Sequence, residues 1–585
     1  MSHSQPHSTR LLLVFLLLLL VADTRAFGQD DPGLPGPFAV ARDEYDFGDT
    51  AFHPTGFPGA GVEVRASVTY PTDLSSGPFP LIVFLHGRHA TCFQGGSAFL
   101  EWPCSAGRSP IPSFQGYDYA SSTLASNGYI VVSISANGIN ANDNSVTDLG
   151  ANARAELIQY HLDILNTFNT TGGPPFGTLF VGAFNLQNVG TMGHSRGGEG
   201  VVRHVLLNAS LGSPYGIQAV LPLAPVDFNR PVVNQVALAV PLPYCDGDVS
   251  DLQGMHFFDD TRYSMPGDPA PKHTILVMGA NHNFFNTVWT PGGPPGAADD
   301  WLAFVGGGSA DPHCGTVAGN HRLTAAQQRG AGNAYMSAFF RVYLGGESQF
   351  FPLLQGDAPP PPSAMTNEIV VSYHPGDDPS TRLDVNRMLD ASSLTTNTLG
   401  GAVVQSGLTP FDVCGGEVPE PQHCLPPGQS TSRQPHTVPS ARSPRRGLSQ
   451  LTMGWSDGTA TYENDLPDGT NDVSGYKVIQ FRAALNFTDV RNAPGSPQDF
   501  VVTLSDGNGD TASAQVSSAS GALYYPPGGP IVTPLPKLIL NTVRVPLTLF
   551  AGIDLTNVRS VVFQFTQPAQ GALMISDVAF ADPQQ

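Results

Sequence analysis

Lysine is nearly absent from this chain, and positive charge is scarce overall. The 585 residues include 27 Lys+Arg against 48 Asp+Glu, a formal net charge of −21, and the three lysines are Lys272, Lys477 and Lys537. Nucleic acids and anionic lipids are themselves negatively charged, so an acidic chain does not attract them. We therefore expect neither to be its main partner.

Long apolar runs are also lacking, with one exception near the N-terminus. Arg10 precedes the run LLLVFLLLLLVA at residues 11–22, and a small-residue site follows near Ala26. The run is well short of the roughly 20 residues that a membrane-spanning helix needs, and its flanks are typical of a secretory signal peptide. We interpret residues 1–26 as that peptide, which predicts a secreted protein, extracellular or periplasmic, without a membrane segment after cleavage.

Glycine and proline are abundant, yet they do not indicate a disordered chain. The 64 Gly and 53 Pro make up about a fifth of the residues, below the roughly 25–30% typical of disorder. Hydrophobic residues account for 41%, enough for sizeable cores. At roughly 100–200 residues per domain, two to four domains are expected.

Six cysteines in an exported chain favour disulfides over metal thiolates or a thiol nucleophile. Local spacing favours Cys92 with Cys104 and Cys414 with Cys424, which leaves Cys245 for Cys314. Six cysteines allow fifteen pairings, so this pairing is a preference among alternatives.

Residues 27–355 have the pattern of an α/β domain. Short runs rich in Val, Ile and Leu recur between residues 60 and 280, several apolar almost throughout, as in strands covered on both faces. Helical spacing occurs at residues 153–168, and a last helix is predicted at residues 324–344. Strand and helix alternation predicts a doubly wound, mostly parallel sheet with helices on both sides.

The character of the chain changes after a proline-rich stretch. Residues 356–364 contain four consecutive prolines, which favour a stiff extended linker. Residues 365–585 carry alternating strand patterns without intervening helices, and we predict an antiparallel β-sandwich there. Within it, residues 414–447 are expected to form a long, poorly ordered loop.

One motif suggests nucleophilic catalysis. The stretch NVGTMGHSRGG contains Gly193-His194-Ser195-Arg196-Gly197, the G-x-S-x-G pattern of a nucleophile elbow, between a strand pattern and a helix pattern. The bare pentapeptide also fits an ordinary glycine-rich turn, but this context favours Ser195 as a nucleophile at the carboxyl end of a strand.

A serine nucleophile needs a base and an acid that orients the base. Downstream, CDGDVSD offers Asp246, Asp248 and Asp251 after an apolar run, and His282 follows the next run. We predict Asp248 as the acid, with Asp251 second and Asp227, which ends LAPVD, third. His282 is the predicted base.

Acyl transfer also needs donors for the developing oxyanion. The HG turn after PLIVFL places a main-chain amide there, so we assign the donors as the N–H groups of Arg88 and of Arg196, the residue after the nucleophile. The Arg196 side chain has two interpretations: contact with a carboxylate-bearing substrate, or pairing with an internal acid such as Glu199.

The motifs FLHG, GHSRGG, DGDV and GANHNFF give residues 60–345 a resemblance to the α/β-hydrolase superfamily, in particular to secreted bacterial enzymes of the dienelactone hydrolase, cutinase and polyester hydrolase group. The resemblance implies an eight-stranded sheet, a triad of Ser195, Asp248 and His282, and hydrolysis of carboxylic esters without metal or organic cofactor. It also implies that a Cys245–Cys314 disulfide braces the acid and base loops.

Residues 543–582 resemble the closing strands of galactose-binding-like jelly rolls, which implies a carbohydrate-binding role. Five aromatic residues are candidates for stacking on sugar rings, although aromatics in a sandwich are more often core: Trp455, Tyr462, Tyr476, Tyr524 and Tyr525. The stretch SDGNGD at residues 505–510 has the oxygen content of a calcium loop, but a hairpin turn is the preferred interpretation.

Two hypotheses of different classes follow. The first is a secreted serine esterase acting on a small or polymeric ester, with an accessory sandwich that docks on a polymer or glycan. The second is a catalytically silent glycan-binding or adhesin-like protein on a hydrolase scaffold. A lipase or lactonase of the same fold is a further alternative, because a triad does not define its substrate.

Overall fold

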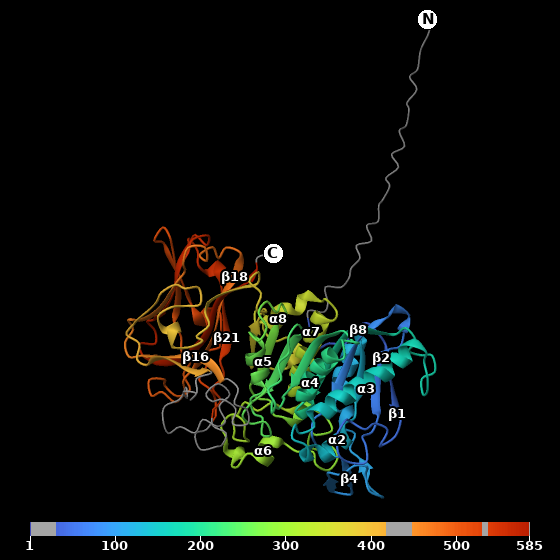
Figure 1. The fold of residues 1–585 in the computed structure, drawn as a ribbon. Coiled ribbons are helices and arrows are strands. Elements are labelled where there is room, and N and C mark those ends of the chain that lie inside the picture. The colour runs from blue at the N-terminus through green and yellow to red at the C-terminus, as the bar shows by residue number, and fades with distance from the viewer. Residues whose placement is uncertain (2–30, 417–446, 529–535, 584–585) are drawn as a thin grey trace.

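The computed structural model describes residues 1, 31–416, 447–528 and 536–583, and its largest element is a nine-stranded mixed sheet (Figure 1). In spatial order the strands are β1 (Val40–Asp46), β2 (Arg65–Pro71), β7 (Ile130–Ile134), β3 (Phe79–Leu85), β8 (Phe184–His194), β9 (Ile217–Leu223), β10 (Ala237–Pro243), β11 (Lys272–Val277) and β12 (Ile369–His374). The six strands from β7 to β11 in this order are parallel, whereas the β1–β2, β2–β7 and β11–β12 pairs are antiparallel.

Helices bury both faces of this sheet. Along β3, Leu81 and Val83 pack into the core that α3 and α4 cover, while Ile82 and Phe84 pack into the core that α1 and α7 cover. This is why the strand sequences are continuously apolar rather than alternating. The helices are α1 (Asp118–Ser126), α2 (Asn137–Asn142), α3 (Ala151–Thr170), α4 (Arg196–Ser210), α5 (Met255–Thr261), α6 (Asp300–Phe304), α7 (Ala325–Tyr343) and α8 (Phe351–Gln355).

A small three-stranded sheet extends the loop after β3. It consists of β4 (Cys92–Gln94), β5 (Ser97–Phe99) and β6 (Ser109–Pro110), with β4 in the middle. The disulfide between Cys92 and Cys104 closes this loop, as predicted.

The C-terminal unit consists of two antiparallel sheets. One contains β15 (Phe411–Gly416), β16 (Gly447–Trp455), β23 (Gly571–Pro583), β18 (Tyr476–Leu485) and β21 (Asn541–Pro546), with β13 (Arg382–Asn386) paired to β23; the other contains β14 (Val403–Ser406), β17 (Ala460–Asp465), β22 (Val558–Phe565), β19 (Val501–Asp506) and β20 (Thr511–Gln515). Their inner faces share one core, in which the rings of Phe481 on β18 and Phe563 on β22 are 5.0 Å apart.

Two of the aromatic residues considered for sugar stacking are core residues. Trp455 and Tyr462 are fully buried between the two sheets, so neither ring is open to a glycan. The stretch at residues 505–510 forms the hairpin between β19 and β20, where Asp506 N donates to Asp510 O at 3.0 Å.

The boundary between the large sheet and the C-terminal sandwich lies further along the chain than predicted. The sandwich was expected to begin at residue 365, but β12 pairs with β11 and forms the edge of the large sheet, which therefore has nine strands rather than the eight implied by the resemblance. The proline-rich segment is also not a free linker, because Ala364 is buried and Ser363 N donates to Asp31 Oδ2 at 2.9 Å.

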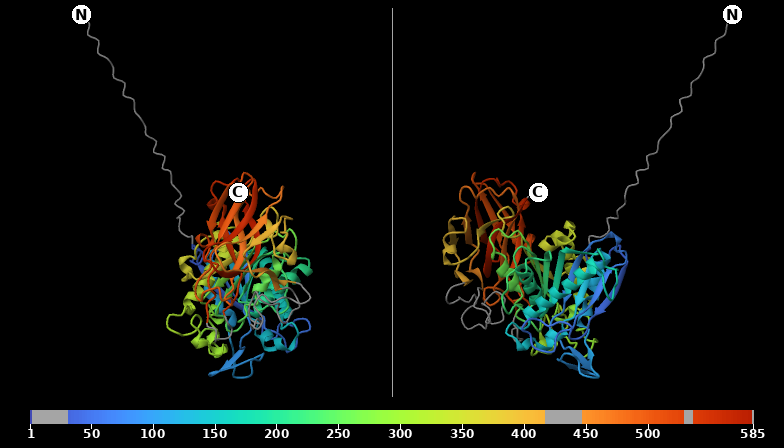
Figure 2. Two further views of the ribbon diagram at one scale, coloured as in Figure 1. Left: turned by 90° about the vertical axis from the view of Figure 1, so that its left-hand side faces the viewer. Right: turned by 45° about the vertical axis from the view of Figure 1, so that its right-hand side comes forward.

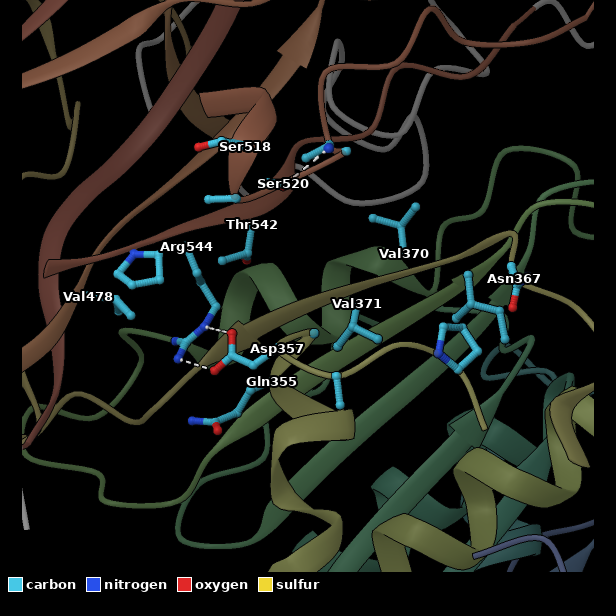
Figure 3. Close-up of a pocket in the computed structure, with 18 of the residues that line it drawn as sticks. Gln355, Asp357, Asn367, Val370, Val371, Val478, Ser518, Ser520, Thr542 and Arg544 are labelled. Atoms are coloured by element: carbon cyan, nitrogen blue, oxygen red, sulfur yellow. Dashed lines mark hydrogen bonds and ion pairs between the residues drawn. The ribbon is translucent and has the colours of Figure 1, made fainter. Parts of the chain in front are cut away.

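The C-terminal unit lies beside the β12 edge, opposite β1 (Figures 1 and 2). Tyr373 N on β12 donates to Thr542 Oγ1 on β21 at 3.1 Å. A cleft of about 880 Å³ opens between the units. Figure 3 shows Arg544 of the second unit facing Asp357 of the first, and its two bonds to this carboxylate measure 2.8 and 2.9 Å.

The second predicted disulfide, Cys245–Cys314, is also confirmed. Cys414 is disulfide-bonded, but Cys424 lies outside the described residues, as do residues 2–30, which hold most of the predicted signal peptide. Most of the predicted loop at residues 414–447 lies outside them too. Disulfides of this kind indicate a non-reducing compartment. In the described part of the chain, no helix combines the length and apolar character needed to cross a membrane.

Candidate active site

The predicted site residues follow four strands of the large sheet and lie at one edge. Leu85 at the end of β3 is in register with Gly193 near the end of β8, and Pro243 at the end of β10 is in register with Val277 at the end of β11. The segments after these strands therefore leave the sheet side by side, along the edge where α2 and α6 lie in Figure 1.

Ser195 occupies a sharp turn between β8 and α4. Its backbone has φ 57° and ψ −123°, a strained conformation for a residue with a side chain. Gly193 makes the turn feasible, because a Cβ there would lie 2.0 Å from the carbonyl oxygen of Gly197. Strand and helix thus meet too closely for any side chain at position 193.

The HG turn after β3 contacts this serine directly. A Cβ on Gly87 would lie 2.5 Å from the Ser195 Cβ, so the backbone before Arg88 lies against the serine. His86 fixes the turn, because its Nε2 accepts the N–H of Ala136 at 2.8 Å. Arg196 is the first residue of α4, and its N–H has no acceptor within the helix. The predicted oxyanion donors thus belong to segments that meet at Ser195.

One buried carboxylate, Asp143, links both donor segments. Its oxygens lie 3.0 Å from Arg88 Nε, 2.9 Å from Arg196 Nη1 and 2.8 Å from Arg154 Nη2. The Arg196 side chain therefore pairs with Asp143 rather than with Glu199, which instead accepts the main-chain and side-chain N–H groups of Asn229 at 2.8 and 2.9 Å.

We expect Asp143→Asn to lower kcat for the ester hydrolysis proposed below about 10- to 100-fold, because the loops that carry both predicted oxyanion donors lose their shared anchor. Removing one charge from a buried cluster also destabilises it, by about 3–5 kcal/mol, so the thermal midpoint should fall. Asp148→Asn is the control, since Asp148 bonds Gly150 N and Asn152 N and none of these arginines. Equal kcat in the two variants would contradict the anchoring role.

The imidazole of His282 is held by Asp246, which corrects the prediction of Asp248. His282 Nδ1 lies 2.8 Å from Asp246 Oδ2. The other oxygen of Asp246 accepts the N–H groups of Asp248 and Val249 at 2.9 and 2.6 Å. This Asx turn aims Asp246 at the histidine and directs Asp248 outward.

The three aspartates predicted as candidate acids, Asp248, Asp251 and Asp227, do not bond Nδ1 of His282. Asp248 Oδ2 lies 3.7 Å from His282 Nε2, on the opposite side of the ring from Asp246, and its side chain is 52% exposed. Asp251 accepts the N–H of Gln253 at 3.3 Å, and Asp227 pairs with Arg230 at 3.3 Å.

A second buried carboxylate, Asp300 on α6, braces both loops. Its Oδ2 accepts the N–H of Gly247 at 2.8 Å and that of His282 at 3.0 Å, and its Oδ1 accepts the N–H of Asn283 at 2.9 Å. Burial and the charge of Asp246 raise the pKa of Asp300 to about 6. The side chain of Asp300 thus joins the acid loop and the base loop, while the Cys245–Cys314 disulfide ties the acid loop to the segment between α6 and α7.

The charge around His282 is strongly negative. Burial by itself would lower the pKa of the imidazole, but the charge and hydrogen bond of Asp246, with the charges of Asp248 and Asp300, raise it to about 9. A histidine with such a pKa is mostly protonated at pH 7, so its activity as a base is expected to rise with pH.

His282 and Ser195 have neighbours in common. The ring of His282 packs on that of His194, the residue before the serine, with centroids 4.8 Å apart. Asp248, next to the Nε2 of His282, lines the same cavity of about 170 Å³ as Ser195, Arg88 and Arg196. His282 Nε2 is buried and makes no hydrogen bond among the described residues, and the carboxylate of Asp248 lies 3.7 Å from it.

A second, larger cavity of about 360 Å³ adjoins the first and shares Arg88 and Asp248 with it. Its lining includes Phe99, Leu100 and Phe304. The pair of cavities therefore offers a small polar space at the serine and a more apolar space beside it.

The only cluster of metal-ligand type among the described residues consists of Cys245, His313 and Cys314. Its two cysteines form a disulfide, and metals bind cysteine as the thiolate, so this cluster does not fit a metal.

Sequence reasoning missed Asp143, Asp300 and the role of Asp246. Only Asp246 had a local signal in the sequence. An Asp side chain typically accepts the main-chain N–H groups two and three residues after it, which forms an Asx turn. Comparison of the chain with models of known families and with curated proteins returned no match.

Proposed function

We propose that this chain is a serine hydrolase that cleaves carboxylic esters, with Ser195 as nucleophile, His282 as base and Asp246 in place of Asp248 as the acid. The observation that carries the proposal is the hydrogen bond between Asp246 and His282 Nδ1 beside the strained Ser195 turn. Serine, acid and base follow in this order along the chain, as in the α/β-hydrolases that the sequence resembles.

In the proposed reaction, Ser195 Oγ attacks the ester carbonyl and transfers its proton to His282 Nε2. The negative charge that develops on the carbonyl oxygen is stabilised by the N–H groups of Arg88 and Arg196. The alcohol leaves with the proton from His282, and an acyl-enzyme remains. His282 then removes a proton from water, which attacks the acyl group, and returns this proton to Ser195 Oγ as the bond to the serine breaks and the acid is released.

Asp246 supports this cycle by bonding Nδ1 of His282, which leaves Nε2 to take the serine proton, and by stabilising the imidazolium that forms. The more apolar cavity lined by Phe99, Leu100 and Phe304 suits the carbon chain of an ester. We further propose that the protein acts after secretion, in keeping with its disulfides.

A fluorophosphonate probe tests the proposal in the whole protein, because it reacts with activated serines. We expect one label, on Ser195, with a rate that rises as His282 loses its proton near pH 9. Mass spectrometry of the labelled peptide identifies the site. No label at any pH would favour the silent glycan-binding alternative instead.

A further inference from the structure

A buried lysine from the C-terminal unit lies next to the loop that carries Asp246 and to the helix that carries Asp300. Lys537 is 1% exposed and precedes β21. Its ammonium donates to the carbonyl oxygen of Tyr244 and lies 5.1 Å from the ring centroid of Tyr244 and 5.5 Å from that of Trp301.

Both of these neighbours are adjacent to the site. Tyr244 stands two residues before Asp246, and its N–H donates to Val277 O at 3.0 Å, which ties the acid loop to the end of β11. Trp301 directly follows Asp300, the carboxylate that holds His282 N. The ammonium therefore contacts the two segments that position the acid and the base.

A buried ammonium is costly unless nearby charges compensate it. Burial lowers the pKa of Lys537 to about 8, against the opposing effect of four carboxylates from three segments: Asp246, Asp251, Asp311 and Asp300. Tyr244 is the other titratable group in contact, and its pKa is raised by burial. Lys537 thus supplies positive charge in an otherwise negative surrounding.

The segment that carries Lys537 is fixed to the first unit. Lys537 N donates to Tyr244 Oη at 3.0 Å, and Tyr244 Oη donates to Pro527 O at 2.7 Å. Ile539 belongs to the core of the large sheet. Elsewhere in the interface, Arg544 is bound to Asp357 (Figure 3).

We propose that Lys537 is a positioning residue of the hydrolase site: the C-terminal unit supplies the cation that holds the acid and base loops together and offsets the carboxylates around His282. This inference rests on the proposed function. It makes the second unit a part of the active site rather than a detachable binding module.

The test uses Lys537→Met in the full chain, with Lys477→Met as the matched control, because Lys477 is exposed on the same unit. Without the cation, the protonated form of His282 is stabilised further by Asp246, Asp248 and Asp300, so its pKa rises. We expect the acidic limb of the kcat/KM profile to move up by about one pH unit, and kcat/KM at pH 7 to fall about tenfold. Lys537→Arg keeps the positive charge, so the acidic limb should return most of the way to its original pH.

A Lys537→Met enzyme with the profile of Lys477→Met would overturn the inference, while probe labelling of Ser195 in both would leave the proposed function intact. Absence of labelling in the unaltered protein would instead overturn the proposed function. If Lys537→Met does not fold, Lys537→Gln decides, because it removes the positive charge and keeps an N–H group that can donate to Tyr244 O. It should shift the limb in the same direction, and an unchanged limb would reject the role.

Discussion

Replacing Ser195 by Ala is expected to lower kcat for a short-chain nitrophenyl ester by about 10⁶-fold, because no acyl-enzyme can form without the hydroxyl. The cavity and its amide donors remain, so KM should change little. The measurement is steady-state hydrolysis at pH 9, where about half of the His282 side chains are unprotonated because the pKa of His282 is raised to about 9.

Ser210→Ala is the matched control, since this serine lies at the far end of the same helix, α4, and donates only to Leu207 O at 2.7 Å. It should keep full activity. A Ser195→Ala enzyme with turnover near that of Ser210→Ala would remove the serine from the mechanism.

The second large effect concerns the choice of acid. Asp246→Asn should lower kcat by about 10⁴-fold, because an amide at this position favours the wrong tautomer of His282 and no longer stabilises the imidazolium. The two main-chain amides that Asp246 accepts from Asp248 and Val249 can still bond the Asn oxygen, so the turn is expected to persist.

Asp248→Asn serves as the contrasting variant, two residues away on the same turn. The negative charge of Asp248 raises the pKa of His282, so its removal lowers that pKa and frees the base at lower pH. We expect the acidic limb of the kcat/KM profile to move to lower pH, with kcat at high pH nearly unchanged. Full pH profiles of both variants decide the matter. A 10⁴-fold loss in Asp248→Asn and a small effect in Asp246→Asn would reverse the assignment.

Structural features that depend on residues close together in the chain could be predicted from the sequence. The turn at Ser195 depends on glycines within two residues of it, and the elbow motif contains them. The preference for Asp248 was wrong as to the partner of His282 Nδ1, because the choice between two aspartates depends on which one closes the Asx turn. That turn is itself local, so the signal for Asp246 lies within three residues of the sequence.

The contacts between residues far apart in the chain that support the site could not be predicted in this way. Asp143 joins Arg88, Arg154 and Arg196, and Lys537 reaches Tyr244 across 293 positions of sequence. No spacing rule connects such residues, because their meeting depends on the packing of whole elements. The burial of Trp455 and Tyr462 was equally undetermined, since an aromatic on a strand can face either side of a sheet.

The β12 strand limits how the two units can be recombined. A chain ended at the apparent linker would lose this strand and leave the outer row of main-chain N–H and C=O groups on β11 unpaired, a common starting point for aggregation. The remaining C-terminal fragment would begin with β12, separated from its partner strand β11. Transfer of the sandwich to other proteins as an independent domain is therefore disfavoured, and the two units are expected to be inherited together.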